Sequence, residues 1–279
     1  MFLGPQSSSS FVDTHHPFHV TYGTGAVAGT VIADNVVVAG LQLPNHTFGV
    51  ADQESVDFSS SNTHFDGIMG VARSTISEQR TLTPVESLAK AGLIQEAITS
   101  FKLSRLADQK NDGEVTLGGL DTSKFDQNTL VTINNVNAEG FWEGAVDAVS
   151  VNGTDLGLTG RTAILDTGTT LLLVPQADAQ VIHQAIPGAV DRGNGTFTLP
   201  CTSTASLALT FGGQSFAIDT RDLTFAPVDR NNGTGDCISG ISGTRLDGPT
   251  QWLAGDVFLK NAYFSTNVGK NTIQLAKLI

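Results

Sequence analysis

The sequence predicts a mostly β protein, and two kinds of pattern support this. Short runs alternate apolar and polar residues or are rich in β-branched side chains, as in residues 18–22 (FHVTY) and 114–117 (EVTL). Glycine-containing turns separate several such runs, for example residues 207–211 and 215–218. A chain of 279 residues, 40% hydrophobic and 15% charged, can bury a sizeable core as one large all-β domain or as two lobes.

The first predicted strands lie in residues 18–22, 30–32 and 35–38. The glycines at positions 23, 25 and 29 predict a thin, mobile ribbon between two of them, with Tyr22 near its tip. An aromatic side chain at such a tip can close over a bound peptide. The alternative is an ordinary glycine-rich hairpin without a binding role.

A short helix is predicted to begin at Thr83 and to end at Gly92, since Thr83 and Glu86 form a capping-box pattern around Pro84. Strand patterns resume at residues 101–103, 114–117 and 130–133. We place a change of lobe between residues 120 and 125, which divides the chain into residues 1–122 and 123–279.

The segment 163–173 (AILDTGTTLLL) places one carboxylate between two aliphatic runs. Ile164 and Leu165 are predicted to end a buried strand, Gly168 permits a tight turn, and residues 171–174 return to the core. Asp166 would then lie at the tip of a rigid loop, where glycine N–H and threonine hydroxyl donors keep it ionised as a general base acting on water. The alternative is an Asx-turn in which Asp166 merely caps a corner.

After this loop the sequence predicts one helix and two hairpins. The helix begins at Pro175 and continues through Ile186, where Pro187 and Gly188 stop it. The hairpins comprise residues 207–218 and 262–275, and the second turns through residues 269–271. Gly255 is expected to let the chain pass close beneath the Asp166 loop.

Four motifs in order resemble the pepsin-like aspartic proteases, similar to secreted fungal enzymes. The segment 163–173 resembles the second active-site loop of that family, and VTYGTG at residues 20–25 resembles its flap. FDGIMG at residues 65–70 and WLAGDVF at residues 252–258 resemble its two hydrophobic-hydrophobic-glycine segments. The resemblance covers the whole chain and implies a bilobal acid protease fold, with a cleft between the lobes and one catalytic aspartate from each.

The resemblance also implies roles for individual residues. Asp166 would be catalytic, supported by Thr167, Gly168 and Thr169. The flap and substrate-binding positions would be Tyr22, Gly23, Thr24, Phe65, Ile68, Phe141 and Leu171. Core packing remains the alternative for Phe141. The apolar subsites would come from Phe65, Ile68, Phe141 and Leu171, which implies a preference for bulky hydrophobic side chains beside the scissile bond. The resemblance further implies protein or peptide substrates and no metal or other cofactor.

The sequence departs from the family pattern because it holds one Asp-Thr-Gly instead of two. Only 21 residues precede Tyr22, and Asp13-Thr14-His15 lacks both the glycine and the aliphatic run. We therefore expect an incomplete first lobe without the first catalytic loop, and a chain that is inactive alone although its family consists of aspartic endopeptidases hydrolysing proteins at acid pH. Two alternatives are a non-catalytic peptide- or protein-binding module and a homodimer with one Asp-Thr-Gly per chain. The homodimer is disfavoured because such subunits are about one lobe long, and the complete protein is expected to be a monomer.

Charge and composition exclude some partners. The formal net charge is −12 and the pI is about 4.7, so nucleic acid and anionic membranes are not expected as partners. No segment has the roughly 20 apolar residues of a membrane span.

Two cysteines and four sequons indicate an oxidising compartment. Cys201 and Cys237 are expected to form a disulfide, which stabilises the fold by roughly 4 kcal/mol in the chain-entropy model. The Asn-x-Thr glycosylation candidates are Asn45, Asn152, Asn194 and Asn232. With the family resemblance, these features predict a secreted or vacuolar protein, although the first residues do not form a signal peptide.

Overall fold

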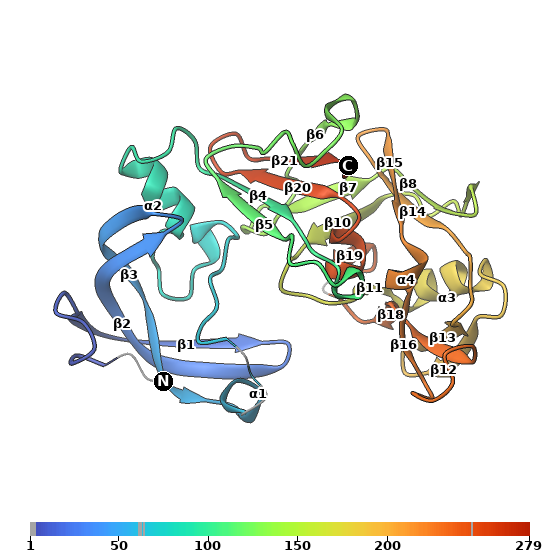
Figure 1. Cartoon of the computed structure of the whole chain (residues 1–279), viewed down its shortest axis with the longest axis horizontal. Coiled ribbons are helices and arrows are strands. Elements are labelled where there is room, and N and C mark those ends of the chain that lie inside the picture. Colours follow the sequence, from blue (N-terminus) through green and yellow to red (C-terminus); the bar gives the residue numbers. More distant parts are fainter. Residues whose placement is uncertain (1–3, 61–62, 64, 247) are drawn as a thin grey trace. The chain divides into compact units, whose positions relative to one another are not determined.

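The computed structural model describes residues 4–60, 63, 65–246 and 248–279 (Figure 1). The chain forms two compact units, residues 1–97 and residues 98–279. Each unit is built mainly from antiparallel strands, so the predicted mostly β class is confirmed.

The first unit contains a three-stranded sheet in the order β1-β2-β3, drawn in blue in Figure 1. The strands are β1 (Val12–Tyr22), β2 (Gly25–Val38) and β3 (Leu41–Glu54). Tyr22 pairs with Gly25, so the β1–β2 hairpin turns through Gly23 and Thr24. The hairpin and the place of Tyr22 beside its tip are as predicted, while the mobility of this ribbon stays a prediction.

Three short helices complete the first unit: α1 (Val56–Ser59), the 3-10 helix η1 (Ser74–Ile76) and α2 (Pro84–Lys90). The capping box of α2 is formed as predicted, because Thr83 Oγ1 accepts from the Glu86 N–H while the Glu86 carboxylate accepts from the Thr83 N–H. Gly92 follows the helix with a φ of +71°, a conformation that favours glycine.

Few apolar side chains are buried in the first unit. Ile32 and Leu88 are fully buried, whereas Val37, Ile68 and Met69 are each more than half exposed. Burial of apolar area is the main favourable contribution to folding. The first unit therefore gains little stability from its own core.

The second unit contains a five-stranded sheet in the order β5-β4-β20-β21-β6. Its strands are β4 (Ile98–Lys102), β5 (Glu114–Leu117), β6 (Val131–Asn134), β20 (Tyr263–Asn267) and β21 (Thr272–Ala276). The lobe boundary predicted at 122/123 falls inside this unit. Strands β4 and β5 precede that boundary, but β4 pairs directly with β20.

A second five-stranded sheet, in the order β18-β11-β19-β10-β7, carries the Asp-Thr-Gly loop. Its strands are β7 (Glu143–Val146), β10 (Arg161–Leu165), β11 (Leu172–Pro175), β18 (Ile241–Thr244) and β19 (Gln251–Ala254). β19 pairs with β10 on one side and with β11 on the other. The connection from β10 to β11 therefore passes across the end of β19.

Two four-stranded sheets complete the second unit, in the orders β12-β13-β17-β16 and β15-β14-β8-β9. Their strands are β8 (Ala148–Val151), β9 (Thr154–Asp155), β12 (Val190–Gly193), β13 (Thr196–Pro200), β14 (Leu207–Phe211), β15 (Gln214–Ile218), β16 (Thr224–Pro227) and β17 (Asp236–Ser239). The helices of this unit are η2 (Leu106–Asp108), η3 (Gln127–Thr129), α3 (Gln176–Gln184), α4 (Thr220–Leu223) and α5 (Asp256–Leu259). The two hairpins and the helix predicted for this half are present, although α3 begins one residue after Pro175 and ends before Ile186.

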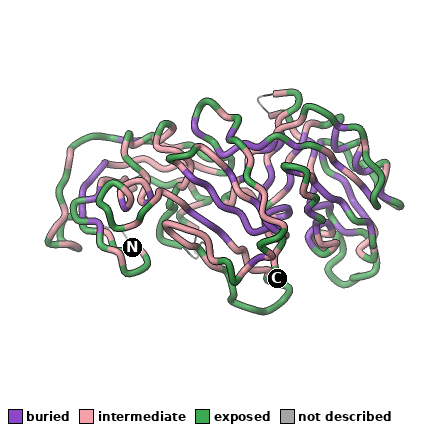
Figure 2. The backbone as a smooth tube through the Cα atoms, turned by 90° about the horizontal axis from the view of Figure 1, so that it is seen from above, coloured by how far each residue is buried: buried purple, intermediate pink, exposed green. Residues whose placement is uncertain are grey.

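The predicted disulfide joins Cys201 and Cys237, with Cα atoms 4.9 Å apart. It links the end of β13 to β17, two strands that also pair through their backbones. The buried parts of the chain follow the paired strands, while the turns are largely exposed (Figure 2).

One buried ion pair ties α3 to the sheet that carries Asp166. Asp178, which is 2% exposed, accepts from Arg161 Nε and Nη2 at 3.0 and 2.7 Å and from Trp252 Nε1 at 2.9 Å. The Arg161 and Trp252 side chains, from β10 and β19, therefore share the carboxylate of Asp178 in α3. Within the described part of the chain, no helix is long and apolar enough to cross a membrane.

Candidate active site

Asp166 follows directly after β10, as predicted from the aliphatic run before it. Ala163 and Leu165 are buried, and the Asp166 N–H donates to the Ala254 carbonyl at 3.1 Å. Leu172, the first residue of β11, is fully buried. The loop is therefore held at both ends by buried strands.

Two donors from the loop itself hold the Asp166 carboxylate. The Gly168 N–H donates to Oδ1 at 2.8 Å, and Thr169 Oγ1 donates to Oδ2 at 2.6 Å. Because one donor contacts each carboxylate oxygen, the two hydrogen bonds fix the plane of the carboxylate. Of the three predicted supporting residues, Gly168 and Thr169 contact the carboxylate directly, and Thr167 precedes them in the chain.

Gly255 passes close to this loop. A Cβ atom at Gly255 would lie 2.1 Å from the Thr169 carbonyl oxygen and 2.6 Å from that of Leu171. Three successive amides then donate to the loop: Gly255 to Leu171 at 3.2 Å, Asp256 to Thr169 at 2.8 Å and Val257 to Thr170 at 3.0 Å. The predicted close approach of Gly255 is confirmed, and it allows the start of α5 to fix three loop carbonyls.

Asp256 is a titratable group beside the loop that the sequence analysis did not single out. Burial raises its pKa to about 6, the ammonium of Lys260 opposes this shift, and the negative charges of Asp166 and Asp222 add to it. The signal was present in the sequence, because Asp256 interrupts an apolar run just as Asp166 does. Perturbed carboxyl groups of this kind cluster at functional sites.

Phe141 and Leu171 lie near the same loop. The Trp142 carbonyl accepts from the Leu165 N–H at 2.8 Å, which places residues 141–142 beside the end of β10. Trp142 is buried, while Phe141 is 39% exposed. The Phe141 side chain is therefore partly open to solvent, and its role in substrate binding stays a prediction.

The remaining predicted substrate-binding residues belong to the first unit. Tyr22, Phe65 and Ile68 line one open cavity of about 880 Å³. Within it, the Phe58 ring packs edge-on against the rings of Tyr22 and Phe65, with ring centroids 5.3 Å and 6.4 Å apart, respectively. Burial raises the pKa of Tyr22, which keeps its hydroxyl protonated and able to donate. Gly23 and Thr24 form the turn beside Tyr22.

No group of three or more histidine, cysteine, aspartate or glutamate side chains is placed to hold a metal ion among the described residues. The donors around Asp166 are a backbone amide and a hydroxyl.

The four sequon asparagines are all exposed. Asn45, Asn152 and Asn194 have positive φ angles of 55°, 52° and 50°, as is common for asparagine in tight turns. Asn152 Oδ1 accepts from the Ser206 N–H, and Asn232 Oδ1 accepts from the Thr234 N–H. Exposure makes all four accessible, and their glycosylation stays a prediction.

A mostly β chain with an Asp-Thr-Gly loop clamped between buried strands has the features of an aspartic protease. A family model for eukaryotic aspartyl proteases matches residues 2–278. The chain therefore belongs to the eukaryotic aspartyl protease family.

Curated relatives of this chain include fungal aspartic proteases. A probable aspartic-type endopeptidase CTSD of Arthroderma benhamiae is 38% identical over 276 residues, covering 98% of this chain and 52% of the relative. The aspartic-type endopeptidase ctsD of Aspergillus fumigatus is 41% identical over 245 residues, covering 88% of this chain and 50% of the relative. Rhizopuspepsin-1 of Rhizopus niveus is 34% identical over 276 residues, covering 98% of this chain and 67% of the relative. The chain spans about half the length of the first two of these relatives.

Proposed function

We propose that this protein is an aspartic endopeptidase in which Asp166 is one of two catalytic aspartates. The observation that carries the proposal is the held carboxylate of Asp166, which accepts from Gly168 and Thr169 in a loop fixed by α5. An ionised carboxylate in this position withdraws a proton from water as the water attacks a peptide carbonyl. A second aspartate protonates the carbonyl oxygen, and no covalent intermediate forms. The two carboxylates share one proton, because like charges a few ångströms apart cannot both be ionised.

We assign substrate contacts to apolar side chains in each unit. Phe141 and Leu171 lie near the catalytic loop, while Tyr22, Phe65 and Ile68 line the cavity of the first unit. These side chains favour protein or peptide substrates with bulky hydrophobic residues beside the scissile bond. The Gly23-Thr24 turn lets the β1–β2 ribbon move as a flap.

The 279 residues contain one Asp-Thr-Gly, so we propose that they do not hydrolyse peptides alone. The second aspartate would come from a longer form of the protein that contains another Asp-Thr-Gly or Asp-Ser-Gly loop. Removing one member of a catalytic unit commonly costs orders of magnitude in rate. The disulfide, the exposed sequons and the fungal relatives, one of them a probable vacuolar protease A of Trichophyton verrucosum, support a secreted or vacuolar location.

The test is hydrolysis of acid-denatured haemoglobin at about pH 3–5 by the 279-residue chain and by the longer form. We expect turnover from the longer form alone, inhibited by a statine-type peptide and abolished by Asp166→Asn. The control is Asp155→Asn, because Asp155 makes the same turn contact, accepting from the Gly157 N–H at 3.0 Å, without lying in the loop. If Asp166→Asn were as active as Asp155→Asn and the wild type, Asp166 would be a turn residue and not a catalytic one. Robust turnover by the 279-residue chain would overturn the requirement for a second loop.

A non-catalytic peptide-binding module is the second candidate, favoured by the single Asp-Thr-Gly and the aromatic cavity of the first unit. It predicts that the longer form binds a statine-type peptide without hydrolysing any protein. Finding no second Asp-Thr-Gly or Asp-Ser-Gly in the full transcript would favour this candidate.

A further inference from the structure

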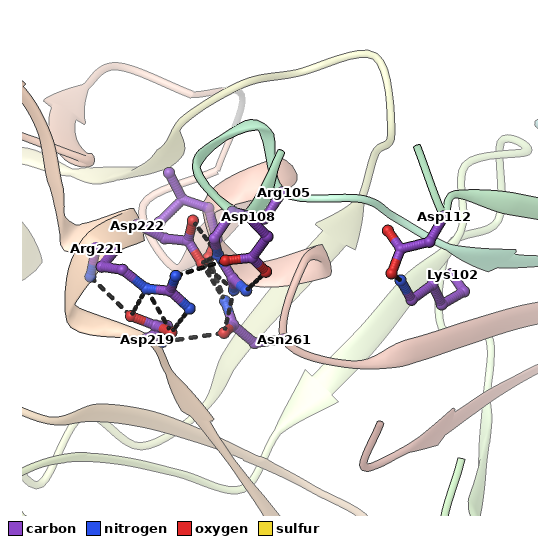
Figure 3. A network of polar contacts seen from close by, with 9 residues as sticks. Lys102, Arg105, Asp108, Asp112, Asp219, Arg221, Asp222 and Asn261 are labelled. Carbon is purple, nitrogen blue, oxygen red and sulfur yellow. Dashed lines mark hydrogen bonds and ion pairs between the residues drawn. The ribbon is translucent and has the colours of Figure 1, made fainter. Parts of the chain in front are cut away.

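The side chain of Asn261, just after α5, makes four hydrogen bonds within the second unit (Figure 3). Its Oδ1 accepts from Arg105 Nη2 and from the Asp219 N–H, both at 3.0 Å. Its Nδ2 donates to Asp222 Oδ2 and to the Val257 carbonyl, both also at 3.0 Å. Every donor and acceptor position of this amide is used, which fixes its orientation.

The partners of Asn261 are themselves anchored. Arg105 donates through Nη2 to Asp222 Oδ2 at 2.6 Å and through Nε to both carboxylate oxygens, and the Asp222 side chain is 5% exposed. Planar, charge-assisted pairs of this kind are rigid as well as strong. The network therefore joins three segments that are distant in sequence: the η2 turn, α4 and the end of α5.

The other end of α5 holds the Asp166 loop. The Asp256 and Val257 amides donate to the Thr169 and Thr170 carbonyls, and Thr169 Oγ1 donates to the Asp166 carboxylate. Val257 occupies a central place, because its N–H supports the loop while its carbonyl accepts from Asn261. A displacement of this single helical turn would move the threonine that orients Asp166.

We propose that Asn261 is a positioning residue for Asp166, acting through α5, and that the Arg105–Asp222 ion pair fixes the amide of Asn261. The proposal rests on the proposed function of Asp166. A helix of four residues has little stability of its own, since short helices depend on tertiary contacts. The donor group of Asn261 supplies such a contact at the carbonyl of Val257.

The first experiment measures amide hydrogen exchange by NMR in the folded 279-residue chain, which needs no peptidase activity. In Asn261→Ala we expect the protection factors of the Asp256 and Val257 amides to fall about tenfold or more, while those of β14 amides such as Leu209 stay unchanged. Asn261→Asp keeps the acceptor for Arg105 but loses the donors to Val257 and Asp222 and places a second carboxylate beside Asp222, so a loss at least as large is expected. The matched control is Lys102→Gln, which removes an ion pair to Asp112 at 2.6 Å in the same region without touching α5 (Figure 3). Unchanged protection at α5, or an equal loss at α5 and β14, would overturn the proposal.

The second experiment measures kinetics of the longer form. Asn261→Ala should lower kcat about tenfold with little change in KM, because the substrate-binding side chains are untouched, and Lys102→Gln should change neither constant. Loss of α5 protection without loss of kcat would overturn the positioning role. An inactive wild-type longer form would instead remove the proposed function, and the exchange result would show separately whether Asn261 holds the loop.

Discussion

The α-carbon of Gly255 lies against the Thr169 carbonyl so closely that an added Cβ would be 2.1 Å from that oxygen. The Thr169 carbonyl is held in place because the Asp256 N–H also donates to it. The end of the loop is held in place because Leu172 is fully buried. The loop that carries Asp166 and the turn that begins α5 therefore form one packed unit. Any side chain at position 255 must separate them.

We expect Gly255→Ala to lower the free energy of unfolding of the second unit by about 3 kcal/mol, the upper end of the usual cost of overpacking, because contact with backbone atoms cannot be relieved by a rotamer change. Urea unfolding followed by tryptophan fluorescence measures this. Gly119→Ala is the control, since a Cβ there meets no atom within 4 Å. Equal midpoints for the two variants would show that the loop moves away without cost.

The buried carboxylate of Asp178 gives the second prediction. Asp178→Ala leaves the Arg161 guanidinium and the Trp252 N–H without their shared acceptor in the core, and we expect a loss of about 3–5 kcal/mol in unfolding free energy. The comparison variant is Asp236→Ala, which breaks the ion pair between Asp236 Oδ2 and Arg192 Nη2, 2.6 Å apart. Both of these side chains are nearly half exposed. Exposed pairs contribute about 0–1 kcal/mol, so this variant should unfold almost as the wild type does. Similar losses in both would contradict the assignment of Asp178 as a core anchor.

Asp256 makes stability depend on pH. Its folded pKa of about 6 lies above the ordinary value of 3.8, so the folded protein favours the protonated form. This group destabilises the fold fully above about pH 6, and the penalty disappears as the pH falls toward 4. Asp256→Asn should raise the free energy of unfolding at pH 7 by about 1 kcal/mol, allowing for solvent screening, with no gain at about pH 3.5. Urea unfolding of both proteins at about pH 3.5, 5 and 7 tests this, and a gain that is independent of pH would assign the effect to packing instead.

Local sequence patterns predicted those features whose causes are local. Thr83 and Glu86 cap α2 three residues apart, and the aliphatic residues around Asp166 form the two buried strands that flank it. Cys201 and Cys237 are the two cysteines of the sequence, so only one disulfide within the chain was possible. The pairing of β4 with β20 has no such signal, because Ser100 and Ser265 hydrogen-bond across a separation of 165 residues. For the same reason the sequence could not show that Arg105, Asp222 and Asn261 meet, or that β4 and β5 pack with the second unit.

The last prediction concerns the unequal cores of the two units. In the first unit Val37, Val56 and Met69 are 62%, 80% and 54% exposed, whereas the second unit buries most of its large apolar side chains and carries the disulfide. Regions with few buried apolar contacts open locally at low cost and are cleaved first. The lobe boundary placed at 122/123 from the sequence would start the resistant part near residue 123, and the sheet pairing of β4 moves the expected start to just before residue 98.

Brief trypsin digestion of the soluble chain should therefore cut after the exposed residues Arg80 and Lys90 and leave a resistant fragment that begins at Thr81 or Ala91. Lys102 and Arg105 are protected, because their side chains are 16% and 15% exposed and pair with Asp112 and Asp222. Amino-terminal sequencing or intact mass of the fragment identifies the cut. Early cleavage after Lys102 or Arg105 would contradict the packing of β4 with the second unit, and uniform resistance with one cooperative melt would show that the first unit is as stable as the second.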